Sequence, residues 1–331
     1  MGLFKKRVQV YVMAFFMCAI SGCGGCGGGG GDSSAGNGGL PPGGGTPGVG
    51  GAAGTILLTV VLSEPAGVTD YSGILVSVSG ASSTSTATTG ADGKLTFSGL
   101  SVTDTKNGTI YNITASKTDY TTATLAVVLI RDGDQMTASM SLQYAASKLV
   151  TQAWSSFSSG NYATALSDFT NAVSRAVTAQ EVSDSNTGLA WTYYLGYASS
   201  DSTKYKSALD SFTTALNANA SNLDAKVGQS FVLVDNAGNN PPATFLGDLN
   251  TAIGNGEQVL TSNSTYSFAN ATQFNYVDVR AMLAYAYAQK YLSTGSAGDK
   301  SSACTNAALV PTTASEYATA SAAMNLVGGC P

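Results

Sequence analysis

Residues 160–173, GNYATALSDFTNAV, decide the fold of this chain. Their apolar members recur three or four positions apart, which predicts an amphipathic helix. The pattern returns 43 residues later, where six residues match Tyr162, Ala165, Leu166, Phe169, Ala172 and Val173 in order: Tyr205, Ala208, Leu209, Phe212, Ala215 and Leu216. So many matches at one offset indicate an internal repeat. A weaker third copy runs through Ala252-Ile253 and Val259-Leu260.

The repeated unit resembles the tetratricopeptide repeat (TPR), a helix–turn–helix motif. Leu195-Gly196 falls where that family places Leu-Gly in its first helix. Phe169 and Phe212 are expected to fill the space between repeats. The resemblance implies an all-α domain over residues 144–331, with three to four helical hairpins stacked as a solenoid and Ala314–Val327 as a capping helix. Close helix approach is predicted at the small residues Ala153, Ala165, Ala172, Gly196, Ala208 and Ala215.

Two features depart from the TPR pattern. The interval of 43 residues is longer than the roughly 34 of that family, which predicts an extra turn or loop within Ala176–Gly188. The proline that closes the motif is absent, and Ala220 stands near its place.

Residues 55–143 have a different period. Their β-branched, partly alternating runs are separated by turn residues, which predicts an all-β sandwich. The last two runs are expected to pair across Asp132-Gly133-Asp134, and Asp92-Gly93 is typical of a hairpin turn. The predicted strands are 55–62, 74–78, 94–97, 110–114, 122–130 and 135–142.

Three runs in this region resemble the carboxypeptidase regulatory-like domain, a transthyretin-like sandwich of about seven strands. They are residues 74–78, 87–100 and 111–120. That family usually has glycine before the last tyrosine, where this chain has Asp119. Such domains are mostly non-catalytic accessories, so the resemblance implies no active site here.

The N-terminus predicts how the protein is held in the cell. Lys5-Lys6-Arg7, an apolar run and small residues before a cut site are typical of a signal peptide, here residues 1–22. Ile20-Ser21-Gly22-Cys23 resembles the lipobox of bacterial lipoproteins, which implies that Cys23 becomes the first mature residue and carries lipid, including palmitate. Residues 23–54 are glycine-rich and predict a flexible tether. Gly24 gives no inner-membrane retention signal in that family, so we expect the outer membrane.

Composition excludes several classes of chemistry. The chain has no histidine, which removes catalytic triads, imidazole zinc sites and His-ligated haem. A net charge of −5 without a basic patch argues against nucleic acid. Of the five cysteines, Cys18 leaves with the signal peptide, Cys23 carries the lipid and Cys26 lies in the tether. In an oxidising envelope the other two, Cys304 and Cys330, are expected to form a disulfide. We predict no cofactor and no metal.

The acidic residues offer no catalytic pattern. Asp132 and Asp134 flank a glycine and are typical turn residues. Asp184-Ser185-Asn186-Thr187-Gly188 hints at a calcium loop, but Leu195 stands where an EF-hand supplies its glutamate. A glycosidase would need two carboxyl groups at a set separation, and the scattered acids make this unfavourable. We therefore predict a protein that is not an enzyme.

The TPR resemblance implies a concave face that binds an envelope protein or peptide segment. Aromatic anchors suit such burial, although a small solenoid also needs large side chains for its own core. Two alternatives stay open: a self-associating subunit of a surface assembly, or a glycan-binding sandwich with a helical spacer. The residues predicted for the groove are Trp154, Phe157, Tyr193, Tyr197 and Tyr285.

Overall fold

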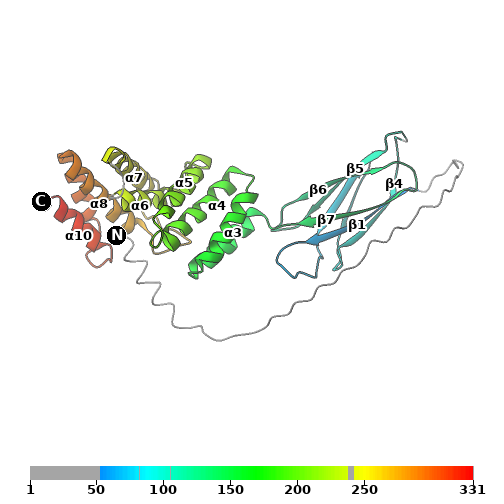
Figure 1. Ribbon diagram of the computed structural model, residues 1–331, viewed down its shortest axis with the longest axis horizontal. Helices are drawn as coiled ribbons and strands as arrows, with labels where there is room; N and C mark the ends of the chain where they lie inside the picture. The colour runs from blue at the N-terminus through cyan, green and yellow to red at the C-terminus, as the bar shows by residue number, and fades with distance from the viewer. Residues whose placement is uncertain (1–52, 82, 105, 238–241, 331) are drawn as a thin grey trace, which may run out of the picture. The chain divides into compact units, whose positions relative to one another are not determined.

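The computed structural model describes residues 53–330 apart from 82, 105 and 238–241. The chain divides into two compact units, and the division falls between Tyr144 and Ala145. The first unit is built of strands and the second of helices (Figure 1). The predicted signal peptide, Cys23 and most of the predicted tether lie outside the described residues. Among the described helices, none combines the length and apolar character that crossing a membrane requires.

The β unit contains two sheets. One has three strands in the order β4-β1-β7, and the other has four in the order β3-β2-β5-β6. All neighbours run antiparallel except β1 and β7, which run parallel. The strands are β1 Gly54–Leu62, β2 Leu75–Gly80, β3 Ser83–Thr88, β4 Lys94–Leu100, β5 Thr109–Ser116, β6 Ala123–Leu129 and β7 Gln135–Leu142.

Both sheets contribute to one hydrophobic core. Alternate residues of β1 are buried, as a strand with one covered face requires. Ile56 of β1 and Tyr111 and Ile113 of β5 are fully buried in the same cluster. The period-2 pattern of the sequence therefore reports the inward face correctly.

Three details of the β unit differ from the sequence prediction. Residues 122–130 and 135–142 do not pair with each other, because β6 bonds to β5 in one sheet and β7 to β1 in the other. The Asp92-Gly93 turn forms but links strands of different sheets, so it is no hairpin. Strand β3 was not predicted, since its Ser/Thr residues are mostly exposed and carry no apolar alternation.

Asp119 occupies the position where the resembled family has glycine. Its φ of 72° lies in the left-handed region that favours glycine. Aspartate is among the residues that tolerate this conformation.

The helical unit consists of antiparallel pairs that pack in chain order (Figure 1). Each helix contacts the next one, and the first helices of successive pairs also contact one another: α2 with α4, α4 with α6, and α6 with α8. The helices are α2 Ala146–Ser158, α3 Tyr162–Arg175, α4 Ala179–Thr192, η1 Tyr193–Tyr197, α5 Thr203–Ala218, α6 Leu223–Asn236, α7 Pro242–Ser262, α8 Tyr276–Thr294, α9 Ala297–Ala308 and α10 Tyr317–Leu326.

Side-chain caps fix where several helices begin. The Asn161 side chain accepts a hydrogen bond from the Thr164 N–H at the start of α3. Thr178 and Glu181 form a reciprocal capping box at α4. Such caps satisfy backbone donors that have no partner inside the helix.

A phenylalanine–glycine contact recurs between pairs. A Cβ atom built on Gly188 of α4 would lie 2.0 Å from Cε1 of Phe169, and one on Gly228 of α6 would lie 2.1 Å from Cζ of Phe212. Each ring therefore rests directly on the backbone of the next helix. This confirms the prediction that Phe169 and Phe212 fill the space between repeats.

The extra length of the repeat is not an inserted loop at Ala176–Gly188, as the sequence suggested. Helix α4 already begins at Ala179, and the five-residue π-helix η1 continues it to Tyr197. The prediction of a loop was wrong because the Ser, Asp, Asn, Thr and Gly residues of this segment favour loops in general. Here they lie in a helix that packs against neighbours on both sides, and most of these small polar side chains are buried.

A disulfide joins Cys304 of α9 to Cys330 after α10, with a sequence separation of 26 residues. Closing a loop of this length contributes roughly 3 kcal/mol by the chain-entropy estimate.

We expect the Cys304→Ser/Cys330→Ser variant to have a free energy of unfolding that is lower by about 3 kcal/mol, because its unfolded chain is no longer cross-linked. The variant should therefore unfold at a lower urea concentration than the wild type. Circular dichroism at 222 nm on the full-length chain measures this. If a reducing agent leaves the free energy of unfolding of the wild type unchanged, the disulfide does not stabilise the fold in this way.

Candidate functional site

The first helices of the pairs carry large aromatic side chains toward a common segment. Trp154 lies on α2, Trp191 on α4 and Phe231 on α6. Residues 263–275, between α7 and α8, pack against them, and we call this segment the inserted loop. The ring of Phe268 lies 5.3 Å from both Trp154 and Trp191, and the ring of Phe274 lies 4.8 Å from Trp191.

The inserted loop is held in place by its own hydrogen bonds and by one to α6. The Phe268 N–H donates to the Phe274 carbonyl at 2.9 Å, and the Tyr276 N–H to the Tyr266 carbonyl at 2.7 Å. The Tyr266 hydroxyl donates to Asp224 Oδ1 at 2.8 Å. Much of the aromatic surface that a TPR-like groove would offer to a partner is therefore covered by this chain itself.

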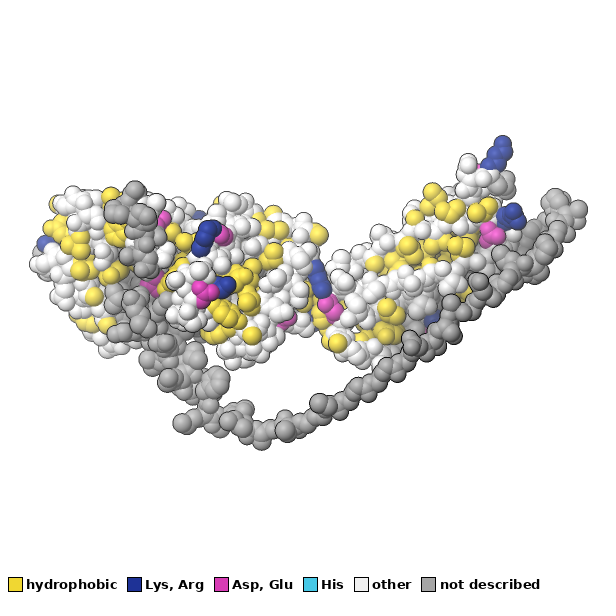
Figure 2. All heavy atoms as spheres, in the orientation of Figure 1, with side chains coloured by type: hydrophobic (Ala, Val, Ile, Leu, Met, Phe, Trp, Pro, Cys, Tyr) yellow, Lys and Arg dark blue, Asp and Glu magenta, His cyan; other side chains and the backbone are white. Residues whose placement is uncertain are grey.

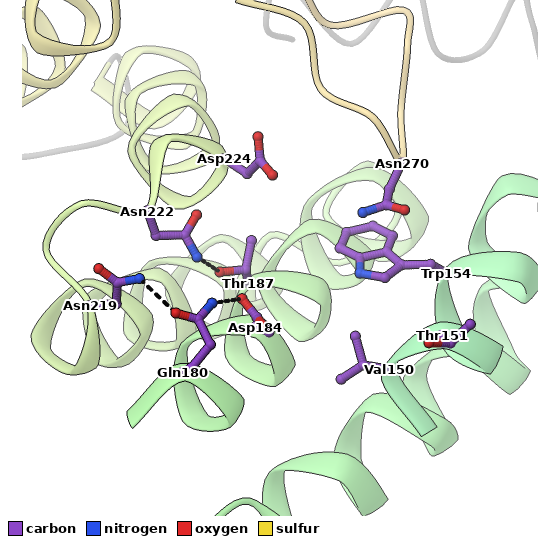
Figure 3. A pocket seen from close by; sticks show the side chains of 10 residues that line it. All are labelled: Val150, Thr151, Trp154, Gln180, Asp184, Thr187, Asn219, Asn222, Asp224 and Asn270. Atoms are coloured by element: carbon purple, nitrogen blue, oxygen red, sulfur yellow. Dashed lines mark hydrogen bonds between the residues drawn. The ribbon is translucent and has the colours of Figure 1, made fainter. Parts of the chain in front are cut away.

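A cavity of about 510 Å³ remains beside the inserted loop (Figure 3). It opens between α2, α4 and the start of α6, and Asn270 of the inserted loop borders it. Its volume falls within the range of ligand pockets. The lining residues are Val150, Thr151, Trp154, Gln180, Asp184, Thr187, Asn219, Asn222, Asp224 and Asn270.

Hydrogen bonds order most of the amide side chains in this lining. Asn219 Nδ2 donates to Gln180 Oε1 at 3.1 Å, and Gln180 Nε2 donates to Asp184 Oδ1 at 2.8 Å. Asn222 Nδ2 donates to Thr187 Oγ1 at 3.0 Å, while Asn222 Oδ1 caps α6. One wall of the cavity is thus a preorganised row of polar groups, as the dashed lines in Figure 3 show.

The cavity is acidic. Asp184 and Asp224 both line it, and no lysine or arginine does. Burial raises the pKa of Asp224, the hydrogen bond from Tyr266 lowers it in part, and the negative charge of Asp184 raises it further. Within the described part of the chain, neither carboxylate forms an ion pair.

Trp154 presents a hydrogen-bond donor to this cavity. Its side chain is 9% exposed, and the indole nitrogen is turned toward Asp184 and Thr187 in Figure 3. No residue that the structure describes accepts a hydrogen bond from this N–H. Its nitrogen is not among the fully buried, unpartnered polar atoms of the described residues, so this donor is open to the cavity and available to a ligand.

The five aromatic residues predicted to line one groove do not lie together in the structure. Trp154 lines the cavity, and none of the other four appears among its lining residues. Phe157 is buried against Trp154 and Tyr162. Tyr193, Tyr197 and Tyr285 are half-buried, with Lys204 Nζ 5.6 Å from the ring centre of Tyr193.

Sequence reasoning missed the polar residues of the cavity, although a signal was present. Asp184, Gly188 and Trp191 on α4 recur 40 residues later as Asp224, Gly228 and Phe231 on α6. This offset belongs to the first helices of the pairs, whereas the 43-residue offset belongs to the second helices. The two carboxylates of the cavity thus occupy equivalent positions in consecutive pairs.

Among the described residues, no group of three or more acidic or cysteine side chains is placed to hold a metal ion. The segment Asp184–Gly188, considered above as a calcium loop, is helical.

No known protein family matches the sequence, and no curated protein matches it either. Among solved structures, a thermophilic TPR protein from Thermus thermophilus is similar over 55% of this chain and 100% of its own, with 14% sequence identity and a TM-score of 0.29. At that TM-score, the description of the helix pairs rests on the contacts within this chain.

Proposed function

We propose that this protein is a non-enzymatic scaffold of the bacterial cell envelope that binds a segment of another envelope protein at the Trp154 cavity. The observation that carries the proposal is the cavity itself, a preorganised polar surface with an unused indole donor. In this proposal the helix pairs form a TPR-like solenoid, and the two sheets form a carboxypeptidase regulatory-like sandwich. The lipid on Cys23 tethers the protein to the outer membrane.

Several features support a binding role over a catalytic one. The chain has no histidine. The two carboxylates of the cavity come from equivalent helix positions and are engaged by Gln180 and Tyr266. No nucleophile activated by a base is found in the cavity lining. Only 11% of the residues are charged, and charged side chains are sparse on the face drawn in Figure 2.

Capture from the source cells tests this proposal. Thr151 is exposed on α2 and lines the cavity, so Thr151→Trp should obstruct it. Thr170 is an exposed threonine of α3 that is not among the lining residues, so Thr170→Trp is the matched control. We expect a specific envelope protein to co-purify with the tagged full-length wild type and with Thr170→Trp, and to be lost with Thr151→Trp. Equal recovery with all three proteins would contradict a role for the cavity.

Self-association is a second candidate, favoured by the outer face of the four-stranded sheet. Ile110 and Val128 are directly paired across β5 and β6, and they are 57% and 40% exposed. Apolar pairs on an open face favour contact with another surface. If copies pair through this face, the Ile110→Ser/Val128→Ser variant will sediment as a monomer at concentrations where the wild type does not. A wild type that stays monomeric at high concentration removes this candidate.

A further inference from the structure

We infer that the Trp154 cavity recognises a lysine or arginine side chain carried by an extended segment of the partner. This inference rests on the proposed function and specifies the chemistry of its site. Three properties of the cavity support it: its charge, its unused donor, and the way in which Trp154 is packed.

The charge of the lining favours a cation. Asp184 and Asp224 face the same space, and no basic residue lines it. Each carboxylate accepts one hydrogen bond from a neutral group, from Gln180 and from Tyr266. These bonds orient the carboxylates without neutralising them. An ammonium or guanidinium group would supply the missing charge and donors, and charge-assisted hydrogen bonds are the strong ones.

The remaining polar groups suit a peptide backbone beside that cation. A peptide carbonyl would accept a hydrogen bond from the Trp154 indole N–H. Asn270 is exposed at the rim and offers both a donor and an acceptor. A segment that bonds to Trp154 and Asn270 through its main chain could place a long basic side chain between Asp184 and Asp224. The volume of about 510 Å³ is sufficient for such a side chain and its flanking backbone.

The packing of Trp154 disfavours a sugar, the other ligand that amides and carboxylates commonly bind. A sugar ring stacks on an exposed aromatic face. Trp154 is only 9% exposed, and the rings of Phe157, Phe169 and Phe268 lie within 5.3 Å of it. The indole therefore offers its N–H edge to the cavity and leaves little face for stacking.

Fluorescence polarisation with three labelled nonapeptides tests the inference on the full-length chain. The peptides share one serine- and alanine-rich sequence and differ only in a central lysine, norleucine or glutamate. We expect the lysine peptide to bind at least tenfold more tightly than the norleucine peptide and the glutamate peptide to bind most weakly. Raising the salt concentration should reduce this difference.

Matched variants connect the preference to the cavity. In Asp184→Asn/Asp224→Asn the lysine peptide should lose its advantage over the norleucine peptide. Asp201→Asn/Asp210→Asn removes the same charge at residues outside the cavity, whose side chains are 44% and 64% exposed, and should retain the preference. Trp154→Phe removes the indole donor and should weaken all three peptides. Circular dichroism of each variant confirms that it folds.

The outcomes separate this inference from the proposed function. Equal affinity for the three peptides, or a lysine preference that survives in Asp184→Asn/Asp224→Asn, overturns the inference. Binding of a neutral oligosaccharide such as chitotetraose in place of all three peptides also overturns it and identifies a sugar site. If an envelope protein is nevertheless lost from the Thr151→Trp variant, the proposed function stands without the charge preference.

Discussion

Replacement of Trp191 by alanine is expected to lower the free energy of unfolding of the helical unit by about 4 kcal/mol. Trp191 is fully buried and touches the rings of Phe212, Phe268 and Phe274. Its indole N–H also donates to the Asp224 carbonyl at 3.2 Å. The variant therefore loses packing between α4, α5 and the inserted loop, together with a hydrogen bond to α6.

Urea unfolding of the full-length chain, followed by circular dichroism at 222 nm, measures this loss, because the helical unit dominates that signal. Leu309→Ala is a suitable control, since Leu309 is 52% exposed and surface changes of this kind usually cost less than about 0.5 kcal/mol. A decrease below about 1 kcal/mol for Trp191→Ala would show that the aromatic cluster is not the centre of the helical core.

The double variant Gly188→Ala/Gly228→Ala should lose a similar amount, about 4 kcal/mol in total. Each added Cβ would meet a phenylalanine ring at about half the normal contact distance, 2.0 Å at Gly188 and 2.1 Å at Gly228. Both rings are fully buried and have no room to retreat. Overpacking of this kind costs about 1–3 kcal/mol per site. The two costs should add, because Gly188 contacts Phe169 whereas Gly228 contacts Phe212.

Gly247 provides the matched control for the glycine variants. It lies in α7 with nothing within 4 Å of an added Cβ, so Gly247→Ala should increase stability by up to about 1 kcal/mol through helix propensity. The same urea titration compares the two. If Gly188→Ala and Gly247→Ala both stabilise the protein, the Phe169 ring does not lie directly against the backbone of α4 at Gly188.

The sequence was most informative where periodicity reflects burial. The 43-residue offset located the second helices of two pairs, since Phe169 and Phe212 occupy equivalent buried positions there. The alternation in β1 likewise marked its buried face. In contrast, the partners of β6 and β7 depend on which sheet each strand joins, and no local pattern in residues 123–142 encodes that choice.

The candidate site was harder to predict because its parts come together only through tertiary packing. Trp154 was identified from its type and register, yet the sequence gives no indication that Phe268 of a distant loop would cover its neighbour Trp191. Asp184 was considered only as a loop ligand, because its helical neighbours are polar and give α4 a weak amphipathic pattern. Its equivalence to Asp224 becomes visible once the boundaries of α4 and α6 are known.

The central claim is that a partner segment occupies the Trp154 cavity, and site-specific photo-crosslinking in the source cells tests it most directly. The photoreactive residue p-benzoylphenylalanine would replace Thr151 at the cavity and, in a separate control, Thr170 on α3. We predict that Thr151 alone yields a crosslinked envelope protein, and that the crosslinked segment contains a lysine or an arginine. Crosslinking at Thr170 with equal yield, or at neither position, would contradict the claim.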